Sequence, residues 1–294
     1  MTLRARTDPA WLEAQYNNRA LVPGHAQHFA RWAEASRLVR ERANALLDVP
    51  YGTGAGETLD LFPATQPAPG AAGGGAPMLV FIHGGYWRSL DKSDFSFIAP
   101  ALNAAGATVV VPNYALCPAV GIEHIALQMT QALAWVWRHA ALHGCDATRI
   151  GVVGHSAGGH LATMLLSCRW KDVVPEMTAQ ALTAALSISG LYDLEPLRHV
   201  ASVQADLQLT PAAVRRLSPA FFPRPKAGKL LAVVGMEESD EFLRQNSLIR
   251  EVWGPTAVPV CETLPGCNHF SVVEGLADAR SRLHHLALRT VGLR

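Results

Sequence analysis

The chain has 294 residues, 49% of them hydrophobic, which is enough to bury a large core within a single domain. Its 25 Lys and Arg residues almost balance its 24 Asp and Glu residues, so the formal net charge is +1. The sequence contains no basic stripe and no block of like charges, which argues against a nucleic-acid partner and against a solvated tail.

Signals for export or membrane insertion are not evident. Residues 1–9 lack the apolar core of a signal peptide, and no run approaches about 18 apolar residues. The cysteines are odd in number and form no C-x-x-C pair, which favours free thiols over disulfides or a zinc site. We therefore expect a cytoplasmic protein with a small-molecule substrate, no membrane partner, no cofactor and no metal; a homodimer stays open. The cysteines are Cys117, Cys145, Cys168, Cys261 and Cys267.

The first part of the chain, residues 1–47, is predicted to be a helical extension. Residues 11–14 and 26–47 are rich in Ala, Arg, Glu and Leu, which favour helices. Residues 58–62 alternate in the manner of an edge strand. Residues 63–77 hold four prolines and four glycines, and are predicted to be an exposed loop within a hairpin.

From residue 78 onward, short apolar runs alternate with helical segments. This pattern predicts an α/β fold, with a mostly parallel central sheet covered by helices on both faces. Residues 195–228 interrupt the pattern with short helical and proline-rich pieces, and are predicted to be a small cap or lid on this single domain. The expected strands are 78–82, 108–111, 150–153, 184–188, 230–234 and 258–261. The expected helices are 95–105, 123–142, one opened by Ser156, 241–253 and 271–289.

The sequence G-H-S-A-G at residues 154–158 lies between an apolar run and a helical run. A strand, a sharp turn and a helix, with a serine at the turn, is typical of a nucleophile exposed above the edge of a sheet. Ser156 is therefore the predicted nucleophile. Because a hydroxyl is a poor nucleophile, the chain must also supply a base, an acid that orients the base, and an oxyanion hole.

Glycines follow the strand expected at 78–82, in the sequence H-G-G-Y-W at 83–87. Backbone N–H groups in such a turn can approach a developing oxyanion closely. Gly84, Gly85 and Tyr86 are candidate donors, and the N–H of Ala157 is the expected second half of the hole.

The base should follow the last strand, and His269 is the histidine at that position. His155 and His160 lie too close to the nucleophile in sequence to accept its proton with good geometry. His284 and His285 are expected on the surface of the final helix.

The acid should follow the strand at 230–234, where residues 237–241 contain four carboxylates. Position in the loop favours Glu238, with Asp240 as the runner-up and Asp193 as a weaker alternative. Any one of these carboxylates would also suit the positive end of a helix dipole without a catalytic role.

These segments together resemble the α/β-hydrolase superfamily, and within it the arylformamidase (kynurenine formamidase) group and related hormone-sensitive-lipase-like esterases. The resemblance covers most of the chain. H-G-G-Y-W at 83–87 is similar to the H-G-G-x-W of the group, and 154–160, 189–194 and 268–270 are also similar. Y-N-N-R at 16–19 resembles a Y-N-x-R segment of the same group.

In this group the segment equivalent to 235–245 reads G-x-x-D-S-x-x-F-x-x-Q. Setting Phe242 and Gln245 on that pattern places Glu238 where the family has its triad Asp. The resemblance therefore implies Glu238 as the acid, with Glu in place of Asp.

The resemblance also implies hydrolysis of N-formyl-L-kynurenine to kynurenine and formate. Four aromatic residues are candidate substrate-binding groups for an aryl substrate, although each also fits core packing. They are Tyr16, Trp87, Tyr192 and Phe270. A pocket narrowed by Trp87 and the N-terminal helices is expected to exclude long-chain lipids. The alternatives are a generalist short-chain carboxylesterase, acyl transfer to a small acceptor, and a non-catalytic hydrolase-fold binding protein.

Overall fold

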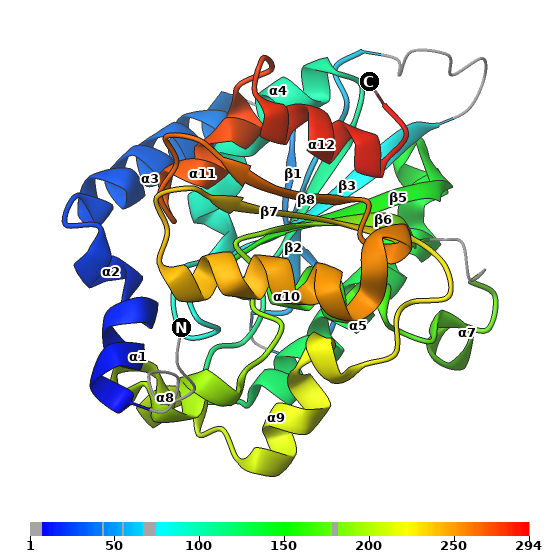
Figure 1. Ribbon diagram of the computed structural model, residues 1–294. Helices are drawn as coiled ribbons and strands as arrows, with labels where there is room; N and C mark the ends of the chain where they lie inside the picture. Colours follow the sequence, from blue (N-terminus) through cyan, green and yellow to red (C-terminus); the bar gives the residue numbers. More distant parts are fainter. Residues whose placement is uncertain (1–7, 43, 55, 67–74, 178–181, 294) are drawn as a thin grey trace.

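A central sheet of eight strands dominates the computed structural model, which describes residues 8–42, 44–54, 56–66, 75–177 and 182–293 (Figure 1). The strand order is β1-β2-β4-β3-β5-β6-β7-β8. β2 is antiparallel to both of its neighbours, and every other pair is parallel, which confirms the predicted α/β class. The strands are β1 (Leu46–Pro50), β2 (Thr58–Phe62), β3 (Ala76–Ile82), β4 (Thr108–Pro112), β5 (Cys145–His155), β6 (Leu182–Ile188), β7 (Lys229–Gly235) and β8 (Val260–Leu264).

Helices cover both faces of this sheet. α3 (His25–Arg42), α4 (Ala99–Ala104) and α12 (Arg282–Thr290) lie on one face (Figure 1). The other face is covered by α5 (Ile122–His139), α6 (Ala157–Leu166) and α10 (Asp240–Ala257). Side chains alternate between the two cores along each strand, because successive residues of a strand point to opposite faces. In β3, for example, Val80 enters one core and Phe81 the other.

Two segments outside the sheet lie side by side at one end of the molecule (Figure 1). The N-terminal segment contains α1 (Pro9–Tyr16) and α2 (Asn18–Leu21). The backbone N–H of Ser202, within the 195–228 segment, donates a 3.0 Å hydrogen bond to Glu13 of α1. The 195–228 segment contains η4 (Glu195–His199), α8 (Ala201–Leu207), α9 (Pro211–Leu217) and η5 (Pro219–Phe221).

The N-terminal part of the prediction needs two corrections. The helix ends at Arg42 instead of residue 47, because the following residues form β1, whose Val49 pairs with Leu59 of β2. β2 is therefore an internal strand and not an edge. The predicted hairpin across residues 63–77 is also wrong, because β4 lies between β2 and β3; residues 67–74 of that loop lie outside the described residues.

The helices expected at 95–105 and 271–289 are each broken. The first consists of the 3₁₀ turn η2 (Lys92–Ile98) and then α4. The second is α11 (Ser271–Glu274), η6 (Gly275–Ala277) and, after a loop, α12. Ser281 starts α12 afresh by accepting a hydrogen bond from the N–H of His284. His284 is not a surface residue as predicted: only 2% of it is exposed, because its ring packs inward and contacts the carbonyl of Leu276.

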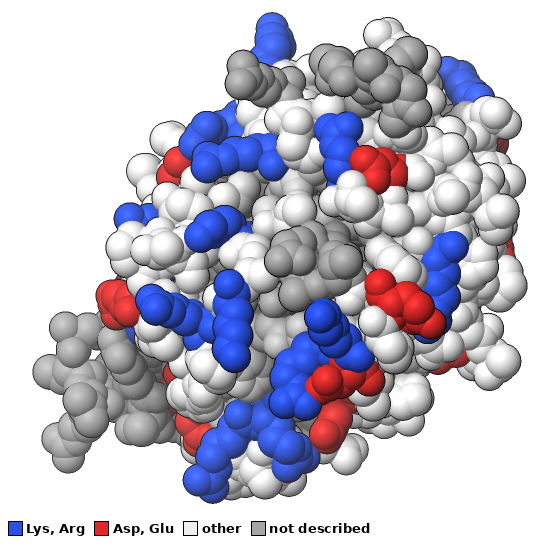
Figure 2. Space-filling view, turned by 90° about the vertical axis from the view of Figure 1, so that its right-hand side faces the viewer, with Lys and Arg blue, Asp and Glu red and all other residues white. Residues whose placement is uncertain are grey.

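The remaining short helices are η3 (Ala140–His143) and α7 (Trp170–Val173). None of the described helices combines the length and the apolar character needed to cross a membrane. On the face shown in Figure 2, Lys and Arg side chains are scattered, and many have Asp or Glu beside them.

Candidate active site

Ser156 occupies the sharp turn between β5 and α6. Its φ of 57° and ψ of −116° are strained for a residue with a side chain, and its N–H donates a 2.7 Å hydrogen bond to Ile188. The turn can be this tight because Gly154 has no Cβ, which would stand 2.0 Å from the carbonyl oxygen of Gly158. The local sequence thus forces the serine hydroxyl out above the carboxyl ends of the strands.

Two neighbouring loops bring His269 and Glu238 to this serine. His269 follows β8, and Glu238 follows β7. The Nε2 atom of His269 is 3.1 Å from Ser156 Oγ, and its Nδ1 atom is 2.6 Å from Glu238 Oε2. Because an ionised carboxylate only accepts hydrogen bonds, Nδ1 carries the proton and Nε2 is left as an acceptor facing the hydroxyl.

Glu238 is itself held in place by two donors. Its Oε1 atom accepts hydrogen bonds from the N–H of Gly235, at 2.8 Å, and from the hydroxyl of Ser189. Its side chain is 1% exposed. Asp240, in contrast, is exposed at the start of α10, and Asp193 faces Arg244. Glu238 is therefore the carboxylate that contacts His269.

The sequence analysis missed Ser189, although it noted the segment 189–194 that starts with this residue. Ser189 has a φ of 52°, which is unusual for a residue other than glycine. The sequence contained one signal for this role: Ser189 comes directly after β6, and the acid comes after the neighbouring strand β7. Its place in the site depends on the pairing of β6 with β7.

The turn after β3 lies against the nucleophile. Gly85 has a φ of 105°, and a Cβ there would stand 2.1 Å from the carbonyl oxygen of Ser89. The carbonyl of Gly85 accepts hydrogen bonds from the N–H groups of Arg88 and Ser89, which closes the turn. Four backbone N–H groups here donate to no other described residue, those of Gly84, Gly85, Tyr86 and Ala157.

A pocket of about 170 Å³ opens onto Ser156 and His269. We call it the Ser156 pocket. Its walls come from α1 to α3, the turn after β3, α8 and the His269 loop. The lining residues are Tyr16, Asn17, Asn18, Arg19, Phe29, Trp32, Gly85, Tyr86, Arg88, Ser89, Leu90, His155, Ser156, Ser202, Val203, His269 and Phe270.

Two of the four aromatic residues predicted to bind substrate, Tyr16 and Phe270, line this pocket. The other two, Trp87 and Tyr192, are buried and are not among the residues that line the pocket. The Trp87 ring packs edge-on against His160, with ring centroids 5.0 Å apart. The Tyr192 hydroxyl is buried and donates a 2.8 Å hydrogen bond to Ser187. Trp87 therefore does not narrow the pocket directly.

His155 and His160 serve as buried donors. The Nε2 atom of His155 contacts the backbone carbonyl of His269 at 2.8 Å, so this ring supports the loop that carries the base. The Nε2 atom of His160 contacts the carbonyl of Leu217 at 2.7 Å. Burial lowers the pKa of His160 to about 4 and holds the pKa of His155 well below its usual range. Both rings are therefore neutral near pH 7.

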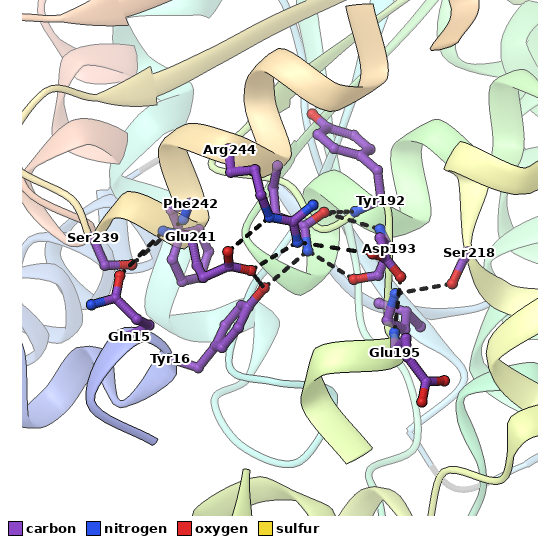
Figure 3. Close-up of polar contacts among 12 residues, drawn as sticks. Gln15, Tyr16, Tyr192, Asp193, Glu195, Ser218, Ser239, Glu241, Phe242 and Arg244 are labelled. Atoms are coloured by element: carbon purple, nitrogen blue, oxygen red, sulfur yellow. Dashed lines mark hydrogen bonds and ion pairs between the residues drawn. The ribbon is translucent and has the colours of Figure 1, made fainter. Parts of the chain in front are cut away.

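A buried polar network ties α1 to α10 and to the loop before η4 (Figure 3). The Tyr16 hydroxyl donates a 2.7 Å hydrogen bond to Glu241, which also pairs with Arg244 at 2.8 Å. Gln245 donates to the Tyr16 oxygen and to the carbonyl of Asp193. Burial, followed by the Glu241 charge, raises the pKa of Tyr16 well above its usual range. This network fixes the wall of the Ser156 pocket that Tyr16 forms.

Comparison with known proteins shows the family to which this fold belongs. Residues 79–246 match the alpha/beta hydrolase fold family. Over 272 residues the chain is 30% identical to the kynurenine formamidase of Salmo salar, covering 90% of this chain and 88% of that protein. Over 160 residues it is 32% identical to esterase LipQ of Mycobacterium tuberculosis, covering 53% of this chain and 37% of that protein. A crystal structure from Silicibacter sp. TM1040, provisionally named a thioesterase, has a TM-score of 0.80 and 31% identity, covering 93% of this chain and 97% of that one.

Proposed function

The chain belongs to the alpha/beta hydrolase fold family, and from that premise we propose that it is a serine hydrolase that cleaves an aryl formamide. N-formylkynurenine is the substrate we choose to represent this class, because the relative from Salmo salar that aligns with 90% of the chain is a kynurenine formamidase. The observation that carries the proposal is the chain of hydrogen bonds from Ser156 through His269 to Glu238 at the base of a pocket.

In the proposed acylation step, Ser156 Oγ attacks the formyl carbon while Nε2 of His269 takes the hydroxyl proton. Glu238 accepts the hydrogen bond from Nδ1–H, which fixes the tautomer and stabilises the imidazolium that forms. The three groups already have this geometry, so little reorganisation precedes attack.

The negative charge that develops on the formyl oxygen is proposed to bind the free N–H groups of Gly85, Tyr86 and Ala157. Protonated His269 then gives its proton to the nitrogen of the leaving arylamine, and the C–N bond breaks. Water attacks the formyl ester by the same steps in reverse, with His269 as the base, and releases formate.

The walls of the Ser156 pocket support an aryl substrate. Five aromatic residues are among those that line it: Tyr16, Phe29, Trp32, Tyr86 and Phe270. We also propose that the 195–228 segment caps this pocket as part of a single domain, because Val203 lines the pocket.

A fluorophosphonate label and kinetics with N-formylkynurenine test the mechanism. We expect the label on Ser156, and we expect Ser156→Ala to lower kcat by about 10⁴-fold or more. Ser167→Ala, at the far end of α6, is the matched control and should keep its activity. Wild-type turnover by Ser156→Ala would disprove the proposal.

A generalist short-chain carboxylesterase is the second candidate, because the same three groups can cleave an ester and because the chain aligns in part with an esterase. Parallel measurement of kcat/KM for N-formylkynurenine and p-nitrophenyl acetate separates the two. A large preference for the ester would favour the second candidate.

A further inference from the structure

The turn after β3, which carries the candidate oxyanion donors, has a strained backbone. Tyr86 and Trp87 have φ values of 52° and 56°, and Leu90 has a φ of 71°. Residues with a side chain rarely adopt such left-handed conformations. They persist only where the surrounding structure imposes them. The contacts that hold this turn therefore decide in which direction its N–H groups point.

Tyr114 supplies one of these contacts. It follows β4, the parallel neighbour of β3, so it lies beside the first residues of the turn. Its hydroxyl donates a hydrogen bond to the carbonyl oxygen of His83 at 2.9 Å and lies 3.2 Å from that of Gly84. The rings of Tyr114 and His83 are stacked, with centroids 4.2 Å apart. Tyr114 is 2% exposed and does not line the Ser156 pocket, so it supports the turn from behind.

The carbonyl of Gly84 is held by a second donor. The Nδ1–H group of His83 donates a 2.8 Å hydrogen bond to it. Because a peptide group is planar and trans, its C=O and its N–H point in opposite directions. The C=O of Gly84 faces the buried Tyr114, so the N–H of Gly85, in the same peptide group, points away from Tyr114. Gly85 lines the Ser156 pocket on that other side.

The loop that contains Tyr114 also holds the turn further along. The N–H of Cys117 donates a 2.8 Å hydrogen bond to the carbonyl of Trp87. Residues 114–117 are therefore bonded to the turn on both sides of Gly85 and Tyr86. The N–H groups of Gly85 and Tyr86 themselves donate to no described residue. The loop thus fixes the conformation of the turn and leaves its donors free for a ligand.

We propose that Tyr114 is a positioning residue for the oxyanion hole. By holding the two carbonyls at the start of the turn, its hydroxyl aims the N–H groups of Gly85 and Tyr86 at the oxygen on which negative charge develops. This inference deepens the proposed function and rests on it for the role of the turn. Tyr114 itself contacts no reacting atom. Loss of its hydroxyl should therefore weaken binding of the transition state much more than binding of the substrate.

The first test is Tyr114→Phe, which removes the hydroxyl and keeps the ring that stacks on His83. We expect kcat for p-nitrophenyl acetate to fall about 10- to 100-fold, while KM changes by less than about twofold. Tyr51→Phe is the matched control, because it removes a buried hydroxyl that donates a 2.7 Å hydrogen bond to Asn113, the residue before Tyr114. This control should keep its kcat. An unchanged kcat in Tyr114→Phe, or an equal loss in the control, would overturn the proposal.

Two ketones of similar shape give a readout that is specific to the oxyanion. Ser156 Oγ can add to the carbonyl carbon of trifluoroacetophenone while its proton passes to His269, which leaves an oxyanion on the inhibitor. Acetophenone binds without this addition. In Tyr114→Phe the inhibition constant of trifluoroacetophenone should rise by about the factor by which kcat falls, and that of acetophenone should stay nearly constant. Equal changes for the two ketones would indicate a distorted pocket and overturn the proposal.

A third variant, Tyr114→4-aminophenylalanine, keeps an N–H donor in place of the hydroxyl. It should recover most of the kcat and most of the preference for trifluoroacetophenone, and it also decides the case in which Tyr114→Phe does not fold. A folded variant of this kind without that preference would overturn the proposal. Failure of the wild-type enzyme to cleave N-formylkynurenine would refute the proposed substrate, whereas the ester and ketone measurements decide the role of Tyr114 independently.

Discussion

At the carboxyl ends of β5, β7 and β8, the three side chains of the proposed triad are joined by short hydrogen bonds, whereas a charged side chain on the pocket wall is loosely held. Glu238 accepts from His269, Ser189 and Gly235. On the wall formed by α2, Arg19 donates one hydrogen bond, of 3.4 Å, to Ser89 and forms no ion pair with a described residue. The difference indicates that contacts within the protein fix the reacting groups, whereas the charged side chain on the pocket wall is only loosely held.

The largest effect on kcat should come from a change in the proposed triad. Glu238→Gln should lower kcat by about 10³- to 10⁴-fold, because the amide can donate to His269 and so favours the wrong tautomer. Asp240→Asn, two residues away and exposed, should change kcat by less than about twofold. Steady-state kinetics on N-formylkynurenine and on p-nitrophenyl acetate provide the check. Similar losses in the two variants would contradict the assignment of the acid.

The oxyanion turn should show the next largest effect. Gly85→Ala forces a Cβ to within 2.1 Å of the Ser89 carbonyl oxygen at a φ of 105°, so the turn must move. We expect kcat to fall about 10²- to 10³-fold while KM changes less, because N–H donors act mainly on the transition state. Gly121→Ala is a control, since a Cβ there meets no heavy atom within 4 Å and α5 begins after it. An equal loss of kcat in this control would argue against the oxyanion role.

Buried histidines behind the site should make stability depend on pH. The pKa of His160 is about 4 in the folded protein, and an unfolded histidine titrates near 6.5, so the unfolded state binds the proton first as pH falls. The contribution of neutral His160 to the free energy of unfolding should therefore be fully present above about pH 6.5. It should be lost as the pH falls towards 4, which lowers the free energy of unfolding by about 3 kcal/mol. The lowered pKa values of His83 and His155 act in the same direction.

Urea denaturation at several pH values between 7 and 4 measures this decline. His160→Gln can keep a donor towards the Leu217 carbonyl but cannot titrate, so its unfolding free energy should vary less over the same range. A variant with the same pH dependence as the wild type would show that His160 does not contribute to it.

The smallest effect should come from the buried polar network that holds Tyr16 in the wall of the Ser156 pocket. Tyr16→Phe removes the 2.7 Å hydrogen bond to the buried Glu241, so the unfolding free energy should fall by about 1–3 kcal/mol. KM should rise as well, because Tyr16 lines the pocket. Tyr51→Phe removes a 2.7 Å hydrogen bond to the carbonyl of Asn113, and since neither residue lines the pocket it should destabilise the protein without changing KM. A KM increase in both variants would contradict a local role for Tyr16.

Local patterns in the sequence predicted much of this structure. The alternation of apolar runs and helical segments after residue 78 predicted the parallel strands, because strands buried on both faces must be apolar throughout. The segment 154–158 predicted a turn between strand and helix, because two glycines allow a conformation that other residues resist. Chain order alone pointed to His269, and the structure brings it to 3.1 Å from Ser156.

Other features depended on contacts between distant segments. Leu46–Pro50 forms a strand because it pairs with β2, although the residues before it favour a helix. Trp87 and Tyr192 looked like pocket residues in the sequence, but packing buries both, whereas Arg19 reaches the pocket because α2 lies beside the turn after β3. Sequence patterns determined which residues could react, since backbone conformation is local. Only the tertiary structure decided which side chains line the Ser156 pocket, because burial depends on what packs against each of them.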